Sequence, residues 1–199
     1  MAILDLNMGF NDQNHGGGAR RQRPLVLRIV LALLAGSVAG FAQAAPQPEH
    51  QVKAAFLFNF PKYVDWPADA FAETNSPIVI ATIGETGLGD ELRELVSDKT
   101  VNGRPLVFKV VAENSAADCH ILFIPESARR RVPAILQNLK GATVLTVGES
   151  DDFLDKGGII NLARRDHKIR LEVNLATARQ AGLKISSKLL SVADVVKGK

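Results

Sequence analysis

The stretch IVIATIGETGLGDELRELVS (Ile78–Ser97) decides the fold. Its first six residues, Ile78 to Ile83, form an unbroken apolar and β-branched run, which is typical of a β-strand. Gly84 to Gly89 follow as a glycine-rich turn, and Asp90 to Ser97 have the pattern of a short helix. A strand that leads directly into a helix is the repeating unit of an α/β fold.

The chain after this stretch alternates in the same way. Asn102-Gly103 is a strong turn signal, and Ser127 can cap a helix that runs to Lys140. Asp151 to Lys156 indicate one helical turn that two glycines stop. Three more strands are expected at 105–111, 119–124 and 143–147.

The last third of the chain contains a predicted hairpin. Its strands are 159–163 and 168–173, with Arg164 to His167 as the turn. A short helix over Leu175–Ala181 is expected to precede a last helix that starts at Ser186 or Ser187 and turns four side chains inward, Leu189, Leu190, Val192 and Val196. We therefore predict a single-domain α/β sandwich with a mostly parallel sheet, an antiparallel hairpin edge and an N-terminal amphipathic helix.

The helix expected over Pro48–Val64 carries more apolar surface than one buried face needs. At about 100° per residue, one stripe contains Val52, Ala55, Phe56, Phe60 and Tyr63. Leu57 and Phe58 fall outside this stripe, so the helix is either covered on two sides or presents its second face to a partner. We take Leu57 and Phe58 as candidate partner contacts. Pro61 is expected to kink the helix because it removes one backbone hydrogen bond.

Residues 1–44 differ from the rest and are interpreted as a leader followed by a cleaved secretory signal. Arginines precede the apolar run Ile29–Phe41, and Ala42-Gln43-Ala44 supplies a small-x-small cleavage site. Cleavage is expected after Ala44 or the alanine that follows it. A membrane-spanning anchor is the alternative, but it needs about 20 apolar residues, more than this run provides. Met8 is an alternative to the first methionine as the start.

Most of the positive charge belongs to this leader. The 199 residues include 24 Lys+Arg and 21 Asp+Glu, a net charge of +3 with a pI of about 9.1, which alone would suggest a nucleic acid or a lipid surface as partner. Residues 1–44 hold four arginines and two acids, so residues 45–199 keep 20 basic and 19 acidic side chains, a net charge of +1. We expect 45–199 to be one exported domain, with no nucleic-acid partner and no membrane insertion after cleavage.

Cys119 is the only cysteine, so no disulfide can form within the chain. It opens an apolar run, where a small buried thiol is the ordinary occupant. A disulfide between two copies is the alternative if Cys119 is exposed. His120 follows it and alternates with core residues, as a buried and hydrogen-bonded histidine would.

The most enzyme-like feature is the turn GETGLG, because backbone amides between a strand and a helix can hold an anion. Its spacing is neither that of GxGxxG nor that of a P-loop, so a plain strand-to-helix turn is the simpler interpretation. If a small ligand binds, we expect it at this carboxyl end of the sheet, on Gly84, Thr86, Gly87 and Gly89.

No catalytic or metal-binding set accompanies this turn. His50, His120 and His167 lack the spacing of a metal site, and the sequence has no GxSxG nucleophile elbow. We therefore expect no enzyme activity, no metal and no cofactor. Arg129 and Arg130 lie early in an expected helix, where cations oppose the helix dipole. They are either solvated charges or candidate contacts for an acidic partner.

Five stretches of the chain carry a resemblance to a known family. They are VKAAFLFNFPKYVDWP (Val52–Pro67), VNGRPL (Val101–Leu106), CHILFI (Cys119–Ile124), VLTVGE (Val144–Glu149) and KIRLEVNLATARQAGLKISSKLL (Lys168–Leu190). In content and order they resemble the YfiR-like family of periplasmic regulators. The resemblance implies a compact α/β sandwich that is often dimeric.

The resemblance also implies that the protein acts by binding rather than by catalysis. YfiR-like proteins hold an inner-membrane diguanylate cyclase inactive by binding its periplasmic part, and an outer-membrane lipoprotein sequesters them. Their output is the level of cyclic-di-GMP, and with it attachment and biofilm. Another membrane sensor is the alternative partner, and a periplasmic sensor module for a small ligand is the alternative function.

Two departures limit what the resemblance implies. The best-known member of the family depends on paired cysteines, whereas Cys119 has no partner in this chain, so redox control through an internal disulfide does not carry over. Pro61 stands where relatives tend to have alanine, which is expected to alter the helix that carries Phe58.

Overall fold

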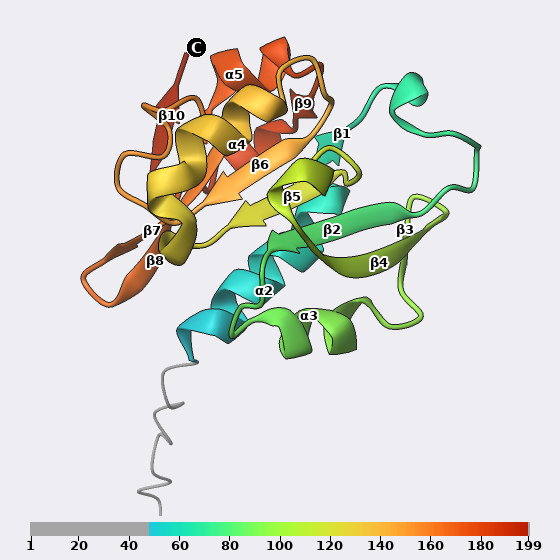
Figure 1. The fold of residues 1–199 in the computed structure, drawn as a ribbon, viewed down its shortest axis with the longest axis horizontal. Helices are drawn as coiled ribbons and strands as arrows, with labels where there is room; N and C mark the ends of the chain where they lie inside the picture. Colours follow the sequence, from blue (N-terminus) through green and yellow to red (C-terminus); the bar gives the residue numbers. More distant parts are fainter. Residues whose placement is uncertain (1–47, 199) are drawn as a thin grey trace, which may run out of the picture. The chain divides into compact units, whose positions relative to one another are not determined.

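An eight-stranded, mostly parallel sheet forms the centre of the fold (Figure 1). The computed structural model describes residues 48–198, so the predicted leader and signal peptide over 1–44 lie outside the described residues. The strand order is β10-β8-β7-β6-β5-β2-β4-β3, and only β7–β8 and β3–β4 are antiparallel neighbours. The predicted fold class, an α/β domain with a mostly parallel sheet, is confirmed.

The strands match most of the predicted runs. In chain order they are β2 (Ile78–Ile83), β3 (Thr100–Val101), β4 (Arg104–Val111), β5 (Ile121–Ile124), β6 (Leu145–Gly148), β7 (Ile160–Arg165), β8 (Lys168–Asn174) and β10 (Val195–Lys197). A separate antiparallel pair joins β1 (Val64–Asp65) to β9 (Lys184–Ile185). Asn102 and Gly103 form the predicted turn between β3 and β4, with φ of 52° and 78°.

Strand β2 lies between β5 and β4 and is buried along its whole length. Ile78 and Ile80 belong to one hydrophobic core, whereas Val79, Ala81 and Ile83 belong to a second core on the other face of the sheet. Because both faces of β2 are covered, it has no solvent side that would favour polar residues. This explains why residues 78–83 form an unbroken run of apolar and β-branched side chains.

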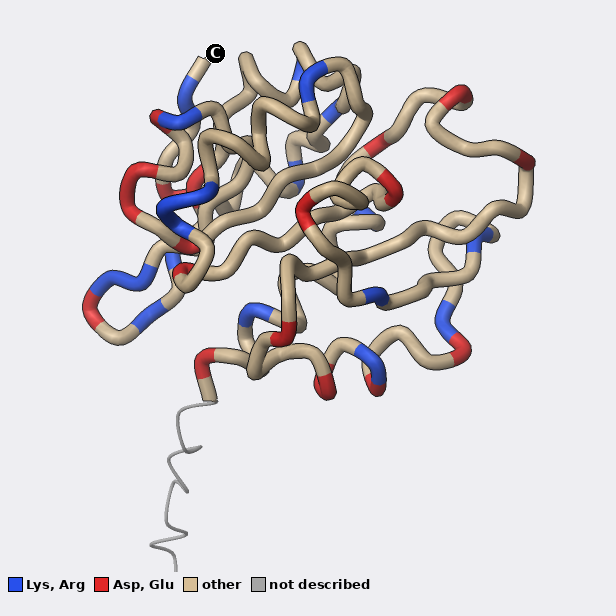
Figure 2. Tube along the Cα trace, viewed as in Figure 1, with Lys and Arg blue, Asp and Glu red and all other residues tan. Residues whose placement is uncertain are grey.

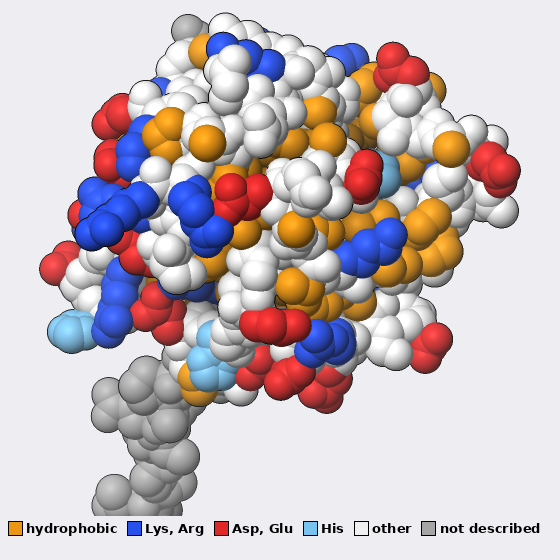
Figure 3. Space-filling view, viewed as in Figure 1, with side chains coloured by type: hydrophobic (Ala, Val, Ile, Leu, Met, Phe, Trp, Pro, Cys, Tyr) orange, Lys and Arg blue, Asp and Glu red, His pale blue; other side chains and the backbone are white. Residues whose placement is uncertain are grey.

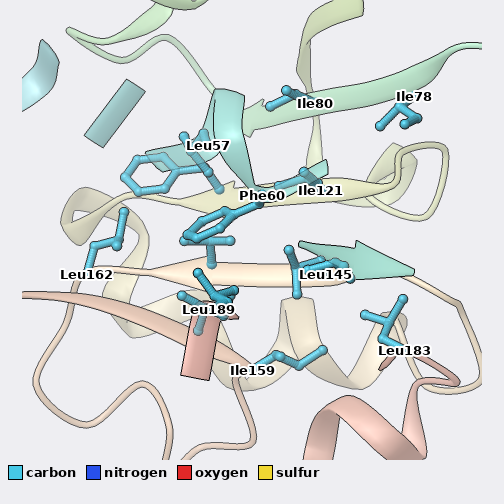
Figure 4. Packing of buried hydrophobic residues seen from close by; sticks show 14 of the residues in the cluster. Leu57, Phe60, Ile78, Ile80, Ile121, Leu145, Ile159, Leu162, Leu183 and Leu189 are labelled. Atoms are coloured by element: carbon cyan, nitrogen blue, oxygen red, sulfur yellow. The ribbon is translucent and has the colours of Figure 1, made fainter. Parts of the chain in front are cut away.

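Helices cover both faces of the sheet. One face carries α4 (Val132–Asn138) and the 3-10 helix η4 (Glu126–Arg131). The other face carries α2 (Glu49–Asn59), α3 (Gly89–Val96), α5 (Leu175–Gln180) and α6 (Ser187–Leu190). Three further 3-10 helices are η1 (Phe60–Lys62), η2 (Ala68–Ala70) and η3 (Glu113–Ser115). Figure 4 shows Leu57 and Phe60 packed with sheet residues in the first core.

Helix α2 sits on the sheet with a different rotation from the predicted one. Its buried side chains are Lys53, Ala54 and Leu57, followed by Phe60 in η1. Leu57, expected to face a partner, is fully buried, so that prediction is wrong. The helix is apolar on two neighbouring sides, so periodicity alone does not decide which side is buried. Pro61, expected to kink this helix, instead lies in the 3-10 helix η1 that follows the end of the α-helix at Asn59.

The C-terminal segment also differs from the prediction. Helix α6 ends at Leu190 instead of continuing to Val196, and Val192, expected to face inward, is 64% exposed. Asp194 explains the difference, because its backbone and its carboxylate both bond to the backbone of Leu171 in β8, at 2.8 Å and 3.0 Å. The chain is thereby extended into β10, parallel to β8. The β7–β8 hairpin is confirmed but lies one strand inside the edge.

The helix expected over 127–140 begins late. Residues from Glu126 to Arg131 form the 3-10 helix η4, and the α-helix starts only at Val132. Pro133 lies in the first turn of α4, where its missing N–H costs no hydrogen bond; farther inside a helix it would break one. The segment expected as a helical turn, Asp151–Lys156, forms consecutive turns without a helix.

His120 joins the loop after η2 to the sheet. Its Nδ1 accepts a hydrogen bond of 3.1 Å from the backbone N–H of Val79, and its Nε2 lies 3.2 Å from the carbonyl oxygen of Ala70. The ring stacks on Phe71 with the centroids 4.6 Å apart. An accepting Nδ1 and a donating Nε2–H require the neutral ring. Burial lowers the pKa of His120, which outweighs the opposing effect of the Ala70 carbonyl.

We expect acidification to destabilise the fold through His120. Its folded-state pKa lies below the ordinary value of 6.5, so the unfolded chain takes up the proton first. The contribution is complete above about pH 6.5 and is lost as the pH falls through the folded-state pKa. Urea unfolding at about pH 7.5 and about pH 5 measures this loss.

The matched variant is His120→Phe, which keeps the stacking on Phe71 but cannot titrate. It is expected to cost about 1–3 kcal/mol at neutral pH, because the N–H of Val79 loses its acceptor. Its stability should fall less on acidification than that of the wild type. Equal losses in both proteins would contradict the assignment.

Cys119 is buried, as expected from the sequence, and the thiol donates to the carbonyl of Ala116 at 3.3 Å. Burial, with a smaller contribution from Asp118, raises the pKa of the thiol to about 12. The reactive thiolate is therefore scarce at neutral pH.

We predict that Cys119 reacts with Ellman's reagent only after the protein unfolds, because both burial and the raised pKa protect it. A non-reducing gel of purified protein should show no disulfide-linked dimer. Rapid labelling of the native protein, or a dimer band that a reductant removes, would show that the thiol is accessible.

Candidate functional site

A pocket of about 420 Å³ opens at the carboxyl ends of three strands. Its walls come from the turn after β2, the loop after β5, the residue after β6 and the start of α2. The chain leaves β2 through α3 on one face of the sheet, and leaves β5 through α4 on the other. The pocket therefore lies where the strand order reverses, the position at which open α/β sheets bind ligands. We name it the switch-point pocket.

The polar centre of this pocket is Lys53, whose side chain is 9% exposed. Its ammonium forms ion pairs with Glu49, one turn earlier in α2, and with Glu149, directly after β6. The other carboxylate oxygen of Glu149 accepts a hydrogen bond of 2.6 Å from the backbone N–H of Glu126. Arg164 approaches Glu49 at 3.1 Å from the outside. A buried ammonium thus lies between two carboxylates that are themselves held in place.

These ion pairs favour the protonated form of Lys53. Burial alone would lower its pKa, but hydrogen bonds to Glu149 and Glu49 outweigh burial and raise it. The hydrogen bond from Lys53 in turn lowers the pKa of Glu49, against the effect of burial. Lys53 stays protonated near neutral pH, so it is neither a nucleophile nor a base. Lys53 thus supplies a fixed positive charge at the centre of the pocket.

One hydroxyl in the pocket has no partner. The Oγ1 atom of Thr86 is buried, and no group in the described residues forms a hydrogen bond with it. Such an atom costs stability unless a water molecule or a ligand satisfies it. Leu88 and Phe123 add apolar walls. The lining therefore suits a ligand that has a polar edge and an apolar body.

The structure brings part of the predicted ligand turn to this pocket. Thr86 and Gly87 line it. Gly84 follows β2 with a φ of +68°, a conformation that favours glycine, and so serves the turn itself. Gly89 is buried as the first residue of α3, facing the ring of Phe108. Ligand binding at this turn stays a prediction.

The two candidate arginines lie at the surface of η4. Arg129 pairs with Asp152 at 3.3 Å and with Glu126 at 3.5 Å, whereas no ion pair joins Arg130 to the described residues. Hydrogen bonds from Lys156 and Arg129 lower the pKa of Asp152 to about 2. Figure 3 shows cations and carboxylates side by side on this face. Arg129 is thus already neutralised, and the role of both arginines as partner contacts stays a prediction.

The remaining candidate on α2 is Phe58. It is partly buried against the first core, and the Lys62 ammonium lies 4.8 Å from its ring centroid. Its position at the surface leaves it available to a partner, unlike that of Leu57.

Reasoning from the sequence misses Lys53 and Glu149, the residues at the centre of the pocket. The sequence does contain a feature that singles out each residue. Lys53 is the single charge in the apolar run 52–58, and Glu149 directly follows a strand. The two residues are 96 positions apart, however, and no local pattern links them.

The described part of the chain has neither a metal-binding cluster nor a membrane-spanning helix. Among residues 48–198, no group of three or more His, Cys, Asp or Glu side chains is placed to hold a metal ion. None of the helices in this part of the chain is long and apolar enough to cross a membrane. Figure 2 shows basic and acidic residues interspersed around the described fold.

The fold resembles two solved structures. A conserved domain protein from Vibrio cholerae O1 biovar El Tor strain N16961 matches with a TM-score of 0.54 and 12% identity, over 75% of this chain and 60% of that chain. The ABC domain in complex with L-Trp from Streptococcus pneumonia matches with a TM-score of 0.46 and 11% identity, over 60% of this chain and 55% of that one. The first likeness supports the fold alone, and the second carries no argument. No curated protein matches the chain.

The family, in contrast, is shown by the sequence. A profile of YfiR/HmsC-like proteins matches residues 50–194, from α2 to the residue before β10. The match covers most of the 199 residues and contains all five stretches that carry the resemblance. The chain belongs to the YfiR/HmsC-like family.

Proposed function

We propose that this protein represses an inner-membrane diguanylate cyclase by binding its periplasmic part. Family membership carries the proposal, because YfiR/HmsC-like proteins are periplasmic regulators of cyclic-di-GMP signalling. The geometry of the switch-point pocket is consistent with it, since its central lysine stays protonated and takes part in ion pairs rather than in catalysis. The proposal has two further parts. An outer-membrane lipoprotein sequesters the repressor, and the repressor itself forms a homodimer.

Deleting the gene is expected to raise cellular cyclic-di-GMP several-fold and to increase biofilm, because the cyclase loses its repressor. Expression of the full chain with its export signal should restore the low level. A pull-down from solubilised membranes, with the mature protein as bait, should recover the cyclase. Unchanged cyclic-di-GMP together with no recovered cyclase would overturn the proposal.

Small-ligand sensing is the second candidate function, and the unpartnered Thr86 hydroxyl favours it. A ligand that satisfies this hydroxyl in the folded state stabilises the fold, and the stabilisation grows with the ratio of ligand concentration to Kd. Sensing would then supply an input to the same regulator.

A thermal-shift screen of nucleotides and amino acids against the mature protein tests this function. We expect a ligand that raises the melting temperature of the wild type but not that of Thr86→Val. The variant alone should be as stable as the wild type or up to about 1 kcal/mol more stable, because it removes an unsatisfied buried hydroxyl. Thr100→Val, on an exposed strand end, is the control and should keep the shift. A flat profile for the wild type would count against ligand sensing.

A further inference from the structure

A second hollow, of about 430 Å³, lies between α2 and α6. Its lining is almost entirely apolar and comprises Val52, Ala55, Phe56, Phe60, Tyr63, Leu189 and Val192, with Asn59 and Lys188 as the polar members. We name it the α2–α6 groove. It contains the whole apolar stripe expected for this helix, of which Phe60 is buried in the first core, whereas Val52, Ala55, Phe56 and Tyr63 stay at least partly exposed.

The short β1–β9 pair builds this groove. Val64 pairs with Ile185, and the backbone N–H of Ser186 donates to the carbonyl of Tyr63 at 2.9 Å. The Ser186 hydroxyl then caps α6 by accepting from the N–H of Leu189 at 3.3 Å. The end of η1 and the start of α6 are thus held together by backbone bonds, so the groove is a fixed part of the fold.

The groove has a buried floor and an exposed mouth. Phe60 and Leu189, both visible in Figure 4, are buried and form the floor. Val192 lies at the mouth and is the most exposed large apolar residue of the described chain. Val192 alone would be an ordinary surface residue, but together with the apolar lining it forms a contiguous apolar surface of the kind at which another molecule binds.

The charges at the groove have one sign. Lys188 lines it, and Lys62 lies one residue before Tyr63 of the lining. Neither lysine forms an ion pair with a carboxylate of the described residues, and the lining contains no acidic side chain. Lys62 bonds instead to the side chain of Asn59 at 2.8 Å. The surface is therefore an apolar hollow with an unneutralised positive rim.

We infer that the α2–α6 groove receives an apolar segment of the repressed membrane protein whose neighbouring residues are acidic. This inference rests on the proposed function. Apolar side chains of the segment fill the hollow, while its carboxylates meet Lys62 and Lys188. Complementary charge fixes the orientation and speeds the encounter, and the apolar contact supplies the affinity.

Charge disfavours the two occupants that this chain itself offers. A symmetric contact between two copies would bring two positive rims together, and the lining of neither copy offers a carboxylate to neutralise them. The predicted signal peptide has an apolar run, but it is preceded by Arg20, Arg21, Arg23 and Arg28, which the lysines would repel. An acidic partner would attract these lysines, whereas a second copy or the signal peptide would repel them.

Complementation of the deletion strain tests the inference. Val192→Asp puts a carboxylate at the mouth of the groove and, because the residue is exposed, should leave the melting temperature unchanged. We expect it to bind the periplasmic domain of the recovered cyclase at least tenfold more weakly and to leave cyclic-di-GMP near the deletion level. Lys188→Glu should weaken binding several-fold, with a larger effect at low salt than at high salt. The matched control is Val110→Asp, at an exposed apolar residue of β4, which should repress like the wild type.

The outcomes distinguish a wrong assignment of the groove from a wrong proposed function. If the wild type itself fails to lower cyclic-di-GMP, the proposed function is wrong. If the wild type and Val192→Asp repress equally and bind the cyclase domain equally, only the groove assignment is wrong. Folded Val192→Asp that loses repression while Val110→Asp keeps it supports the groove.

A lipid surface is tested separately, since an apolar patch with lysines also suits anionic membranes. Vesicles of phosphatidylglycerol and phosphatidylcholine should leave the mature wild-type protein unbound in a flotation assay, because Val192 is the one strongly exposed large apolar residue of the groove and the others line a hollow. Flotation of the wild type that Val192→Asp abolishes would overturn the inference in favour of a lipid.

Discussion

The buried ammonium of Lys53 constrains how α2 lies on the sheet. Removing one partner of a buried ion pair typically costs about 3–5 kcal/mol, so the orientation in which Lys53 reaches Glu149 is strongly preferred. In that orientation Ala54 and Leu57 enter the core. The neighbouring side, with Phe56, is left at the α2–α6 groove. The orientation that brings Lys53 to Glu149, 96 residues away, therefore also places one wall of the switch-point pocket and one wall of the groove.

The sheet could be predicted from the sequence because each of its strands and turns is marked by a pattern within its own residues. Strand β2 is covered on both faces and consists of apolar or β-branched residues throughout, and the β7–β8 hairpin is marked by a polar turn at Asp166 and His167, both with positive φ. Where a pattern is produced by burial of neighbouring residues, reading it from the sequence succeeds. The turn at Asn102 and Gly103 belongs to the same group, because the left-handed backbone there favours these residue types.

The features that were missed depend on distant residues. An apolar segment such as 189–196 suits a helix as well as a strand, and the bonds between Asp194 and Leu171 decide in favour of a strand after α6. The rotation of α2 depends on Glu149, and the unpartnered hydroxyl of Thr86 is visible only once the pocket is closed around it. The ligand turn expected from the sequence lies at the edge of the sheet where the switch-point pocket opens, whereas Lys53, the charge at the centre of that pocket, is not among the expected site residues.

Cys119 has a consequence for how the protein reaches its native state. With one cysteine in the whole chain, and that one buried, the native fold contains no covalent cross-link between its elements. Folding then needs neither a thiol oxidase nor a disulfide isomerase, and it cannot be trapped by wrongly paired cysteines within one chain. The regulator should mature equally well when the compartment is oxidising and when its oxidising machinery fails.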